Sequence, residues 1–246
     1  MDMSAHKSLN GRRVIVIGGG SGIGLAAARR ASELGAEVTI AGRGAERLER
    51  AAADFPNPVR TKVLDVRKED DVQVFFSETG PFDHLVVTAG ELKHGSGKLT
   101  ELDTSSAREQ FESRFWGPYL AVRHGASAIR EHGSVTLISG FFGDKAIPGA
   151  SVPSAVHGAI ENLARVLAVE LAPVRVNVVS PGYADTPLHD GLTAEQKQAW
   201  FEQTAPTLPV RHIAEADELA DAILFLIGNG YTTGVTLTVD GGARLV

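Results

Sequence analysis

A cluster of glycines near the start of the chain has the composition of a phosphate-binding turn. It lies between an apolar, β-branched run, Val14–Ile17, and a stretch rich in Ala, Leu and Arg. Glycine permits a tight turn and lets backbone N–H groups approach a pyrophosphate, while a helix start offers unpaired donors and the positive end of its dipole. A glycine turn between a first strand and a first helix predicts a dinucleotide site. The residues expected to line it are Gly18, Gly20, Ser21, Gly22, Ile23 and Gly24.

The end of the second expected strand carries an arginine where an acid is common. Sites that prefer NAD usually have an acidic side chain here for the ribose 2′-hydroxyl, whereas an arginine suits the 2′-phosphate of NADP. Gly42 occupies the place of the acid, and Arg43 follows it directly. We therefore expect NADPH as the cofactor. The alternative is that Arg43 simply opens a helix in solvent.

Two further strand ends carry residues suited to a bound cofactor. Asp65 and Val66 follow the third expected strand, where a carboxylate can meet an adenine amino group. Ala89 and Gly90 follow the fourth, where small residues allow the cofactor to come close. Ligands of open α/β sheets bind outside the carboxyl ends of the strands, so these residues are expected to border the same site as the glycine turn.

The elements behind these motifs alternate between strand and helix. This order predicts an α/β fold of the Rossmann type: a doubly wound, mostly parallel sheet of about seven strands with helices on both faces. The strands are expected at Val14–Ile17, Glu37–Ala41, Thr61–Asp65, His84–Thr88, Ser134–Ser139, Arg175–Ser180 and Thr236–Val239. The helices are expected at Gly24–Leu34, Gly44–Asp54, Ser105–Arg130, Pro153–Leu171 and Ala216–Leu226.

The length of the chain and its continuous alternation of strands and helices predict a single domain, residues 1–246, because there is no internal repeat and no low-complexity linker. Residues 183–209 form the longest stretch without strand character and include a helical segment, Ala194–Gln203. A long excursion of this kind is often a lid over a substrate site, and is otherwise surface structure.

Charge and composition narrow the range of partners. The formal net charge of −6 and a pI near 5.8 argue against nucleic acid and anionic lipid. The chain has no cysteine, which excludes disulfides and thiolate metal sites, and no metal is expected. The polar start lacks the apolar stretch of a signal peptide, and the apolar runs are too short to span a bilayer. We expect a cytoplasmic protein with a small-molecule substrate.

Further motifs continue in order towards the carboxyl terminus. They are Arg175-Val176-Asn177, Ser180-Pro181-Gly182, Thr186, Thr233-Gly234 and Val239-Asp240-Gly241-Gly242. Together with the glycine turn, Asp65-Val66 and Ala89-Gly90, they make the chain resemble the short-chain dehydrogenase/reductase family over nearly its whole length. The resemblance implies hydride transfer between NAD(P)(H) and a carbonyl or alcohol, in homodimers or homotetramers. It also implies that Pro181 and Gly182 lie beneath the nicotinamide ring and that Thr186 lies near its amide.

The active site departs from the pattern of that family, whose members use an Asn, a Ser, and a Tyr and Lys spaced as Tyr-x-x-x-Lys. The simplest comparison puts Val152 at the Tyr position and Val156 at the Lys position. Arg114 stands for the Asn and Gly140 for the Ser, with Ser139 one residue early. A tyrosine with a pKa near 10 acts as an acid only with a nearby cation, and two valines supply neither group.

Two residues are therefore expected to take over the catalytic role. Ser139 can present a hydroxyl to a bound carbonyl, and Arg114 can offer a cationic contact to a developing oxyanion. Each has a structural alternative: an ordinary serine at a strand end, and an arginine that bridges helix and loop. The weaker candidates are His157, the loop residues Glu91, Lys93 and His94, and Tyr183, Asp185 and His189 beside the expected lid.

Two functions remain open at this point. The first is an NADP-dependent oxidoreductase with a non-standard site, acting on a carbonyl, an alcohol or an activated double bond. The second is a catalytically inactive NADPH-binding sensor or partner subunit. The retained Thr186 and Pro181-Gly182 favour the first, and the two valines favour the second.

Overall fold

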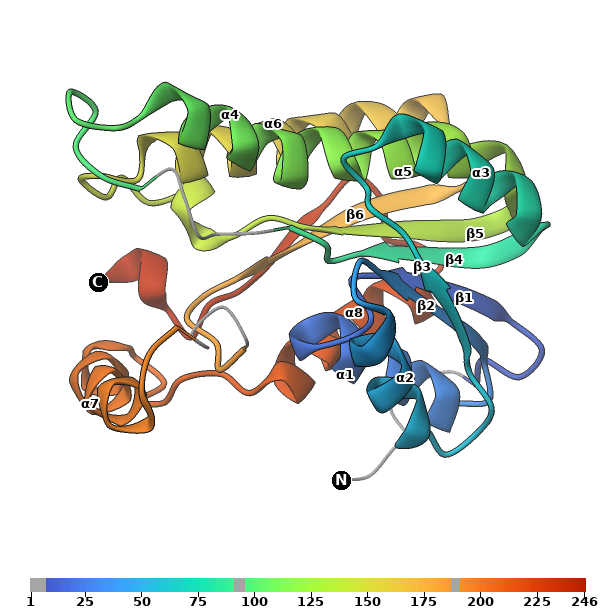
Figure 1. The fold of residues 1–246 in the computed structure, drawn as a ribbon, viewed down its shortest axis with the longest axis horizontal. Helices are drawn as coiled ribbons and strands as arrows, with labels where there is room; N and C mark the ends of the chain where they lie inside the picture. The colour runs from blue at the N-terminus through green and yellow to red at the C-terminus, as the bar shows by residue number, and fades with distance from the viewer. Residues whose placement is uncertain (1–7, 91–95, 187–190) are drawn as a thin grey trace.

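The computed structural model describes residues 8–90, 96–186 and 191–246. They form a seven-stranded sheet with the strand order β3-β2-β1-β4-β5-β6-β7, and every pair of neighbouring strands is parallel. This confirms the predicted Rossmann-type fold (Figure 1). The strands are β1 (Arg13–Ile17), β2 (Glu37–Gly42), β3 (Arg60–Val63), β4 (Phe82–Val87), β5 (Ile129–Ile138), β6 (Arg175–Pro181) and β7 (Thr236–Val239).

Helices cover both faces of the sheet, with α3, α5 and α6 on one side and α1, α2 and α8 on the other (Figure 1). The longer helices are α1 (Gly22–Glu33), α2 (Ala45–Ala53), α3 (Glu69–Thr79), α4 (Thr104–Phe111), α5 (Gly117–Gly125), α6 (Ser151–Glu170), α7 (Ala194–Thr204) and α8 (Ala216–Gly228). A π-helical turn, η2 (Glu112–Trp116), joins α4 to α5, and short 3₁₀ turns are η3 (Ala126–Ala128), η4 (Phe141–Gly143), η6 (Ala205–Thr207) and η7 (Ala243–Leu245).

The central strands are apolar on both faces because each face has its own core, whereas the edge strand β3 is exposed along its length. In β1, Ile15 and Ile17 pack into the core beneath α3, α5 and α6, whereas Val14 and Val16 pack into the core beneath α1, α2 and α8. Side chains of a strand alternate between faces, so an unbroken apolar run places a buried residue on each side. The central strand β4 is buried along its whole length.

The order of the strands reverses between β1 and β4. The chain moves outward from β1 to β3, then returns to start β4 on the other side of β1. At such a switch point the loops after the two neighbouring strands diverge and leave a crevice at the carboxyl edge of the sheet. The glycine turn follows β1, and Ala89 and Gly90 follow β4, so both border this crevice.

The helix predicted at Ser105–Arg130 is wrong at its carboxyl end. The structure interrupts it with the π-helical turn, ends α5 at Gly125 and places Arg130 in β5. Arg130 Nη1 donates to Asp83 Oδ2 at 2.7 Å, which ties this residue to the neighbouring strand end. Gly125 lies against the ring of Phe76, where a Cβ would approach to 2.7 Å. Both contacts join residues distant in the sequence.

The segment predicted as a lid contains the expected helix, α7. Backbone hydrogen bonds tie its start to the strand-like segment before α8: Asp185 N donates to Ala214 O at 2.8 Å, and Ala214 N donates to Tyr183 O at 3.0 Å. Helix α7 buries no residue, and 187–190 lie outside the described residues. The lid role stays a prediction. Among the described helices, none has the length and apolar character needed to cross a membrane.

Candidate functional site

The glycine turn is seated tightly on the end of β4. Gly18 has a positive φ of 96°, and a Cβ on it would lie 2.4 Å from Thr88 Oγ1 and 2.6 Å from Ala89 N. A Cβ on Gly24 would lie 2.4 Å from both Gly18 O and Thr88 Oγ1. Only glycine fits at these two positions, and the result is a turn whose backbone is fixed at the switch point.

The amino end of α1 is open to an anion. Its N-cap residue, Ser21, makes no side-chain cap hydrogen bond, and no acid lies in the first turn that Gly22 and Ile23 begin. The first N–H groups of a helix have no partner within the helix, and the helix dipole favours negative charge there. The turn and the helix start therefore fit the pyrophosphate of a dinucleotide.

Arg43 and Asp65 lie at the ends of neighbouring strands, since Gly42 at the end of β2 pairs with Val63 in β3. Asp65 accepts three hydrogen bonds from Arg67, at 2.9 Å from Nε, 2.6 Å from Nη2 and 3.1 Å from the backbone N. These bonds hold the pKa of Asp65 below its usual range, and the charge of Arg43 adds a smaller effect. The carboxylate expected to meet adenine thus already has a partner in the chain, and the role of Arg43 at a 2′-phosphate stays a prediction.

Val66 is buried beside Gly117 at the start of α5, where a Cβ on Gly117 would lie 2.7 Å from Val66 Cγ2. This contact holds the backbone after β3 against the helical layer. Val66 therefore positions the backbone at the edge of the site, and its side chain is turned into the core.

The segment after β6, where the nicotinamide is expected, contains a tightly packed glycine and a buried hydroxyl. A Cβ on Gly182, which follows the last residue of β6, Pro181, would lie 2.6 Å from Asp240 Cα, so the close packing requires glycine. Thr186 Oγ1 is buried and has no hydrogen-bond partner within the described chain. A buried hydroxyl without a partner is costly, and a cofactor amide would satisfy it.

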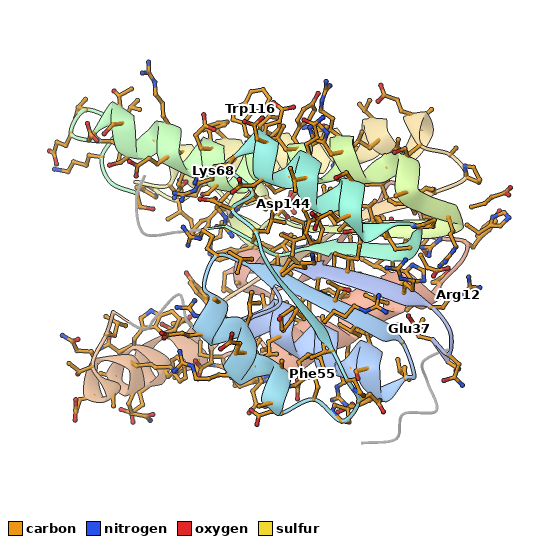
Figure 2. All side chains as sticks on the ribbon, turned by 45° about the vertical axis from the view of Figure 1, so that its right-hand side comes forward. Arg12, Glu37, Phe55, Lys68, Trp116 and Asp144 are labelled. Carbon is orange, nitrogen blue, oxygen red and sulfur yellow. The ribbon has the colours of Figure 1, made fainter. Side chains whose placement is uncertain are left out.

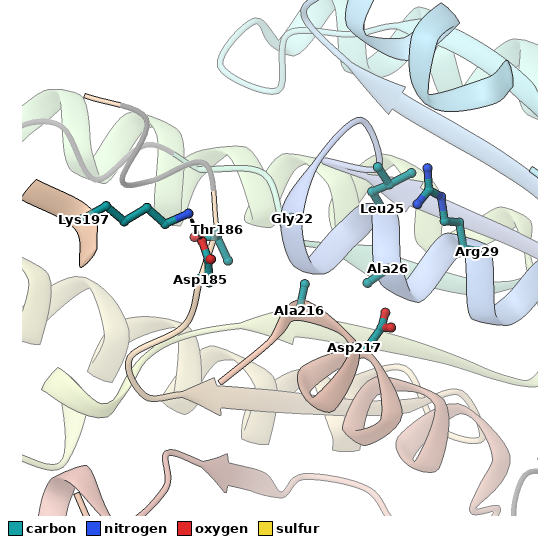
Figure 3. A pocket seen from close by; sticks show the side chains of 9 residues that line it. All are labelled: Gly22, Leu25, Ala26, Arg29, Asp185, Thr186, Lys197, Ala216 and Asp217. Carbon is teal, nitrogen blue, oxygen red and sulfur yellow. Dashed lines mark ion pairs between the residues drawn. The ribbon is translucent and has the colours of Figure 1, made fainter. Parts of the chain in front are cut away.

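Thr186 faces a cavity of about 370 Å³ between the start of α1, the start of α8 and the segment after β6 (Figure 3). Lys197 and Asp185 form an ion pair of 2.5 Å at one end of the cavity. Its lining residues are Gly22, Leu25, Ala26, Arg29, Asp185, Thr186, Lys197, Ala216 and Asp217. The turn, the arginine after β2 and the unpartnered hydroxyl together fit NADP(H).

Ser139 is buried and already bonded. Its Oγ donates to Glu161 Oε1 of α6 at 2.8 Å, and both side chains are at most 5% exposed. Burial raises the pKa of Glu161, with the Ser139 hydrogen bond acting in the opposite direction. Sequence reasoning missed Glu161; the available signal was its spacing of four residues from His157, which puts both on one face of a helix.

Arg114 lies in the π-helical turn and reaches the end of β4. A Cβ on Gly90 would lie 2.9 Å from Arg114 Cγ and 3.1 Å from its Nε. Turns of π-helix often occur at functional sites. Arg114 and Gly90 are thus brought together at the carboxyl edge of the sheet, and the role of Arg114 stays a prediction.

The structure favours a different alignment of α6 with the family pattern, shifted by one residue. His157 lies against Gly140, where a Cβ would approach its Cε1 to 2.6 Å, whereas Val156 is fully buried one residue earlier. Pro153 lies four residues before His157 and is also buried. The pair Pro153 and His157, rather than Val152 and Val156, therefore occupies the helix face next to Gly140.

The remaining candidates lie elsewhere. Tyr183 packs against Phe141, with ring centroids 4.9 Å apart, and burial raises its pKa, which makes it a weaker acid. Glu91, Lys93, His94 and His189 are outside the described residues. Within the ranges that the structure describes, no group of three His, Cys, Asp or Glu residues could hold a metal.

Comparisons with known proteins identify the family of the chain. Residues 18–244 match the family described as enoyl-(acyl carrier protein) reductase. The chain is 35% identical to cis-4-hydroxycyclohexanecarboxylate dehydrogenase of Sinomonas cyclohexanicum, over 96% of this chain and 97% of that protein. It is 32% identical to 3-oxoacyl-(acyl-carrier-protein) reductase of Homo sapiens, over 94% of this chain and 97% of that protein.

Solved structures give the same result. One described as a small-chain dehydrogenase in complex with NADPH is 36% identical, with a TM-score of 0.83 over 96% of this chain and 99% of that chain. Another, described as a short chain dehydrogenase/reductase family protein, is 36% identical, with a TM-score of 0.87 over 97% of this chain and all of that chain. The chain belongs to the short-chain dehydrogenase/reductase family.

Proposed function

We propose that the protein is an NADPH-dependent oxidoreductase that interconverts a carbonyl or activated double bond with its reduced form, using a non-standard active site. The observation that carries this proposal is the glycine turn, where Gly18, Gly24 and Thr88 pack too closely for any added side chain. The open amino end of α1 supports it. So do relatives named as dehydrogenases and reductases and a similar structure in complex with NADPH.

NADPH, when bound, would supply the hydride, and the chain would supply a positive charge near the substrate and a proton. Arg114 brings a positive charge to the end of β4, and its pKa, lowered by burial to about 10, leaves it cationic at neutral pH. Glu161, whose pKa is raised, holds a proton more readily than an exposed carboxyl does, and Ser139 links it to the end of β5. In this proposal the hydrogen bond between the two side chains reverses: protonated Glu161 donates to Ser139 Oγ, Ser139 passes its own proton to the substrate oxygen, and Glu161 is left as a carboxylate.

Arg43→Ala is expected to weaken NADPH binding about tenfold to a hundredfold and to leave NADH binding unchanged. A charge-assisted arginine–phosphate contact contributes roughly 1.5–3 kcal/mol, and NADH has no 2′-phosphate. Fluorescence titration of both cofactors measures the effect. Arg50→Ala is the matched control, because Arg50 is an exposed arginine on α2. Equal affinity of the wild type for the two cofactors would contradict the proposed preference.

Ser139→Ala is expected to slow NADPH oxidation roughly 10²–10⁴-fold while leaving NADPH affinity intact, because it removes the link between Glu161 and the site. The assay screens carbonyl and enone substrates. Glu161→Gln preserves a hydrogen-bonding partner for Ser139 but removes the acid, and should slow the reaction by a similar factor. Activity indifferent to both changes would remove Ser139 and Glu161 from the mechanism.

The competing function is an NADPH-binding sensor or partner subunit without turnover. It is favoured by the positions of the tyrosines: Tyr119 packs on the core, Tyr183 on Phe141, and Tyr231 is fully exposed. None of them lies on the helix face next to Gly140. Tight NADPH binding combined with no oxidation of any substrate in the screen would support this second function.

We also propose that the protein forms a homodimer or homotetramer in solution. Helix α6 exposes Val166 and Val169, at 53% and 79%, and Trp116 stands 44% exposed on the outside of the same helical layer (Figure 2). Apolar side chains of this size are usually buried by a symmetry mate. Light scattering at micromolar concentration should give two or four chain masses, and Val169→Glu should shift the mass towards one. A strict monomer would contradict the proposal.

A further inference from the structure

The end of β4 holds a buried cation. Arg114 Nη1 is shielded from solvent and makes no hydrogen bond to any described residue. Its Cγ and Nε lie over Gly90, which has no side chain to separate them from the strand end. The π-helical turn thus fixes a guanidinium at the carboxyl edge of the sheet with at least one N–H group uncommitted.

No described carboxylate compensates this charge. The ion pairs of the described chain do not include Arg114. The buried acid Glu161, on the same helix as His157, accepts a hydrogen bond from Ser139, and burial raises its pKa and so favours its neutral form. A buried charge without a partner is strongly unfavourable. A negatively charged ligand that binds from solution would explain why the chain keeps a buried cation here.

His157 adds a second uncommitted group. It is 3% exposed, stacks on Phe142 at 6.0 Å and has no hydrogen-bond partner of normal geometry at either ring nitrogen. Burial, together with the positive charge of Arg114, lowers the pKa of His157 to about 3, although the nearby Gly140 backbone opposes this. The ring is therefore neutral at pH 7, with one N–H to donate.

Both groups lie at adjacent strand ends. Gly90 follows β4 and Gly140 follows β5, and these strands are neighbours in the sheet. The guanidinium offers only donors, and the neutral imidazole offers one donor beside one acceptor nitrogen. An uncharged hydroxyl or amide would leave the buried positive charge uncompensated, whereas a carboxylate accepts from a donor of each group and neutralises the cation.

We propose that Arg114 and His157 form a receptor for the carboxylate of the substrate, so that the substrate is an oxo acid or the matching hydroxy acid rather than an uncharged ketone or alcohol. That the bound carboxylate belongs to a substrate rests on the proposed function. The carboxylate site itself does not, because it requires neither NADPH nor turnover.

The first experiment titrates butyrate and its uncharged analogue butyramide into the protein by calorimetry, with and without NADPH. The wild type should bind butyrate at least tenfold more tightly than butyramide. Arg114→Gln should abolish that preference, Arg114→Lys should retain part of it, and Arg108→Gln, an exposed arginine on α4, should retain all of it. Equal binding of the two compounds, or a preference that survives Arg114→Gln, would overturn the proposal.

A second measurement separates a binding role from a structural one. Arg114→Met removes an uncompensated buried charge, and should raise the thermal midpoint of the free protein by roughly 2–4 °C. Butyrate should raise the midpoint of the wild type and leave that of Arg114→Met unchanged. A structural arginine would give a lower midpoint in the variant and no response to butyrate in either protein, which would refute the site.

NADPH affinity is the third readout. It should be unchanged in Arg114→Gln, because the phosphate-binding groups lie at β1 and β2. A loss of NADPH affinity with no effect on butyrate would assign Arg114 to the cofactor and overturn the proposal. If butyrate binds as expected and no oxo acid is reduced, the carboxylate site stands and the proposed enzymatic function fails.

Discussion

Gly24→Ala is expected to weaken NADPH binding about 100-fold or more and to reduce the free energy of unfolding by roughly 1–3 kcal/mol. The added Cβ would lie 2.4 Å from Gly18 O and from Thr88 Oγ1, so the turn must move away from β4. Two charge-assisted hydrogen bonds to the pyrophosphate, at roughly 1.5–3 kcal/mol each, would be lost or lengthened. Fluorescence titration and urea denaturation measure the two effects.

Gly158→Ala is the matched control for this change. Gly158 lies inside α6 with no atom within 4 Å of the position of a Cβ. Alanine at such a helical position stabilises by roughly 0.5–1 kcal/mol, and NADPH affinity should stay the same. If Gly24→Ala bound NADPH as tightly as the wild type, the pyrophosphate would not lie on this turn.

Much of the fold follows from local sequence. All seven predicted strands are present, with β7 at Thr236–Val239 as predicted, and the central ones carry the clearest signal because buried parallel strands require apolar side chains on both faces. Helix α1 begins two residues earlier than expected, at Gly22. The helix predicted through Arg130 failed because its end depends on Phe76 and Asp83, residues far away in the sequence.

The candidate site carries a local sequence signal only in part. The glycine turn and Arg43 can be picked out as candidate cofactor-binding residues from the sequence alone, because the residue type and its position after a strand are enough to suggest that role. The contact between Ser139 and Glu161 has no such signal, because it joins a strand end to a helix 22 residues later. The sequence also does not show which face of α6 lies next to Gly140. A shift of one residue turns a side chain by about 100° around the helix, and only the packing decides which residues face Gly140.

Restoring the four side chains used by the family, at the positions that the structure favours, is expected to raise the reduction of uncharged ketones roughly 10²–10⁴-fold. The natural protein should reduce such ketones slowly, because it lacks a tyrosine with a cation beside it on this helix face. NADPH oxidation, expressed as kcat/KM, measures the gain. The four changes are Arg114→Asn, Gly140→Ser, Pro153→Tyr and His157→Lys.

The register of these changes comes from the packing of α6. His157 is the residue whose ring lies against Gly140, and Pro153 is one turn earlier on the same face. A serine in place of Gly140 would collide with the imidazole, which is why Gly140→Ser and His157→Lys are made together. Arg114→Asn removes a cation that would otherwise repel the new lysine.

The matched control is the pair Val152→Tyr with Val156→Lys, which follows the alignment one residue earlier. Val156 is fully buried, and a lysine there would have to lose its charge or unfold the helix, at a cost of several kcal/mol. This control should therefore be less stable in urea than the wild type and gain no ketone reduction. The opposite outcome would be that the control pair folds and reduces ketones, while the fourfold variant binds NADPH but reduces none. The active-site face of α6 would then be the one containing Val156, and the placement of His157 at the active site would be wrong.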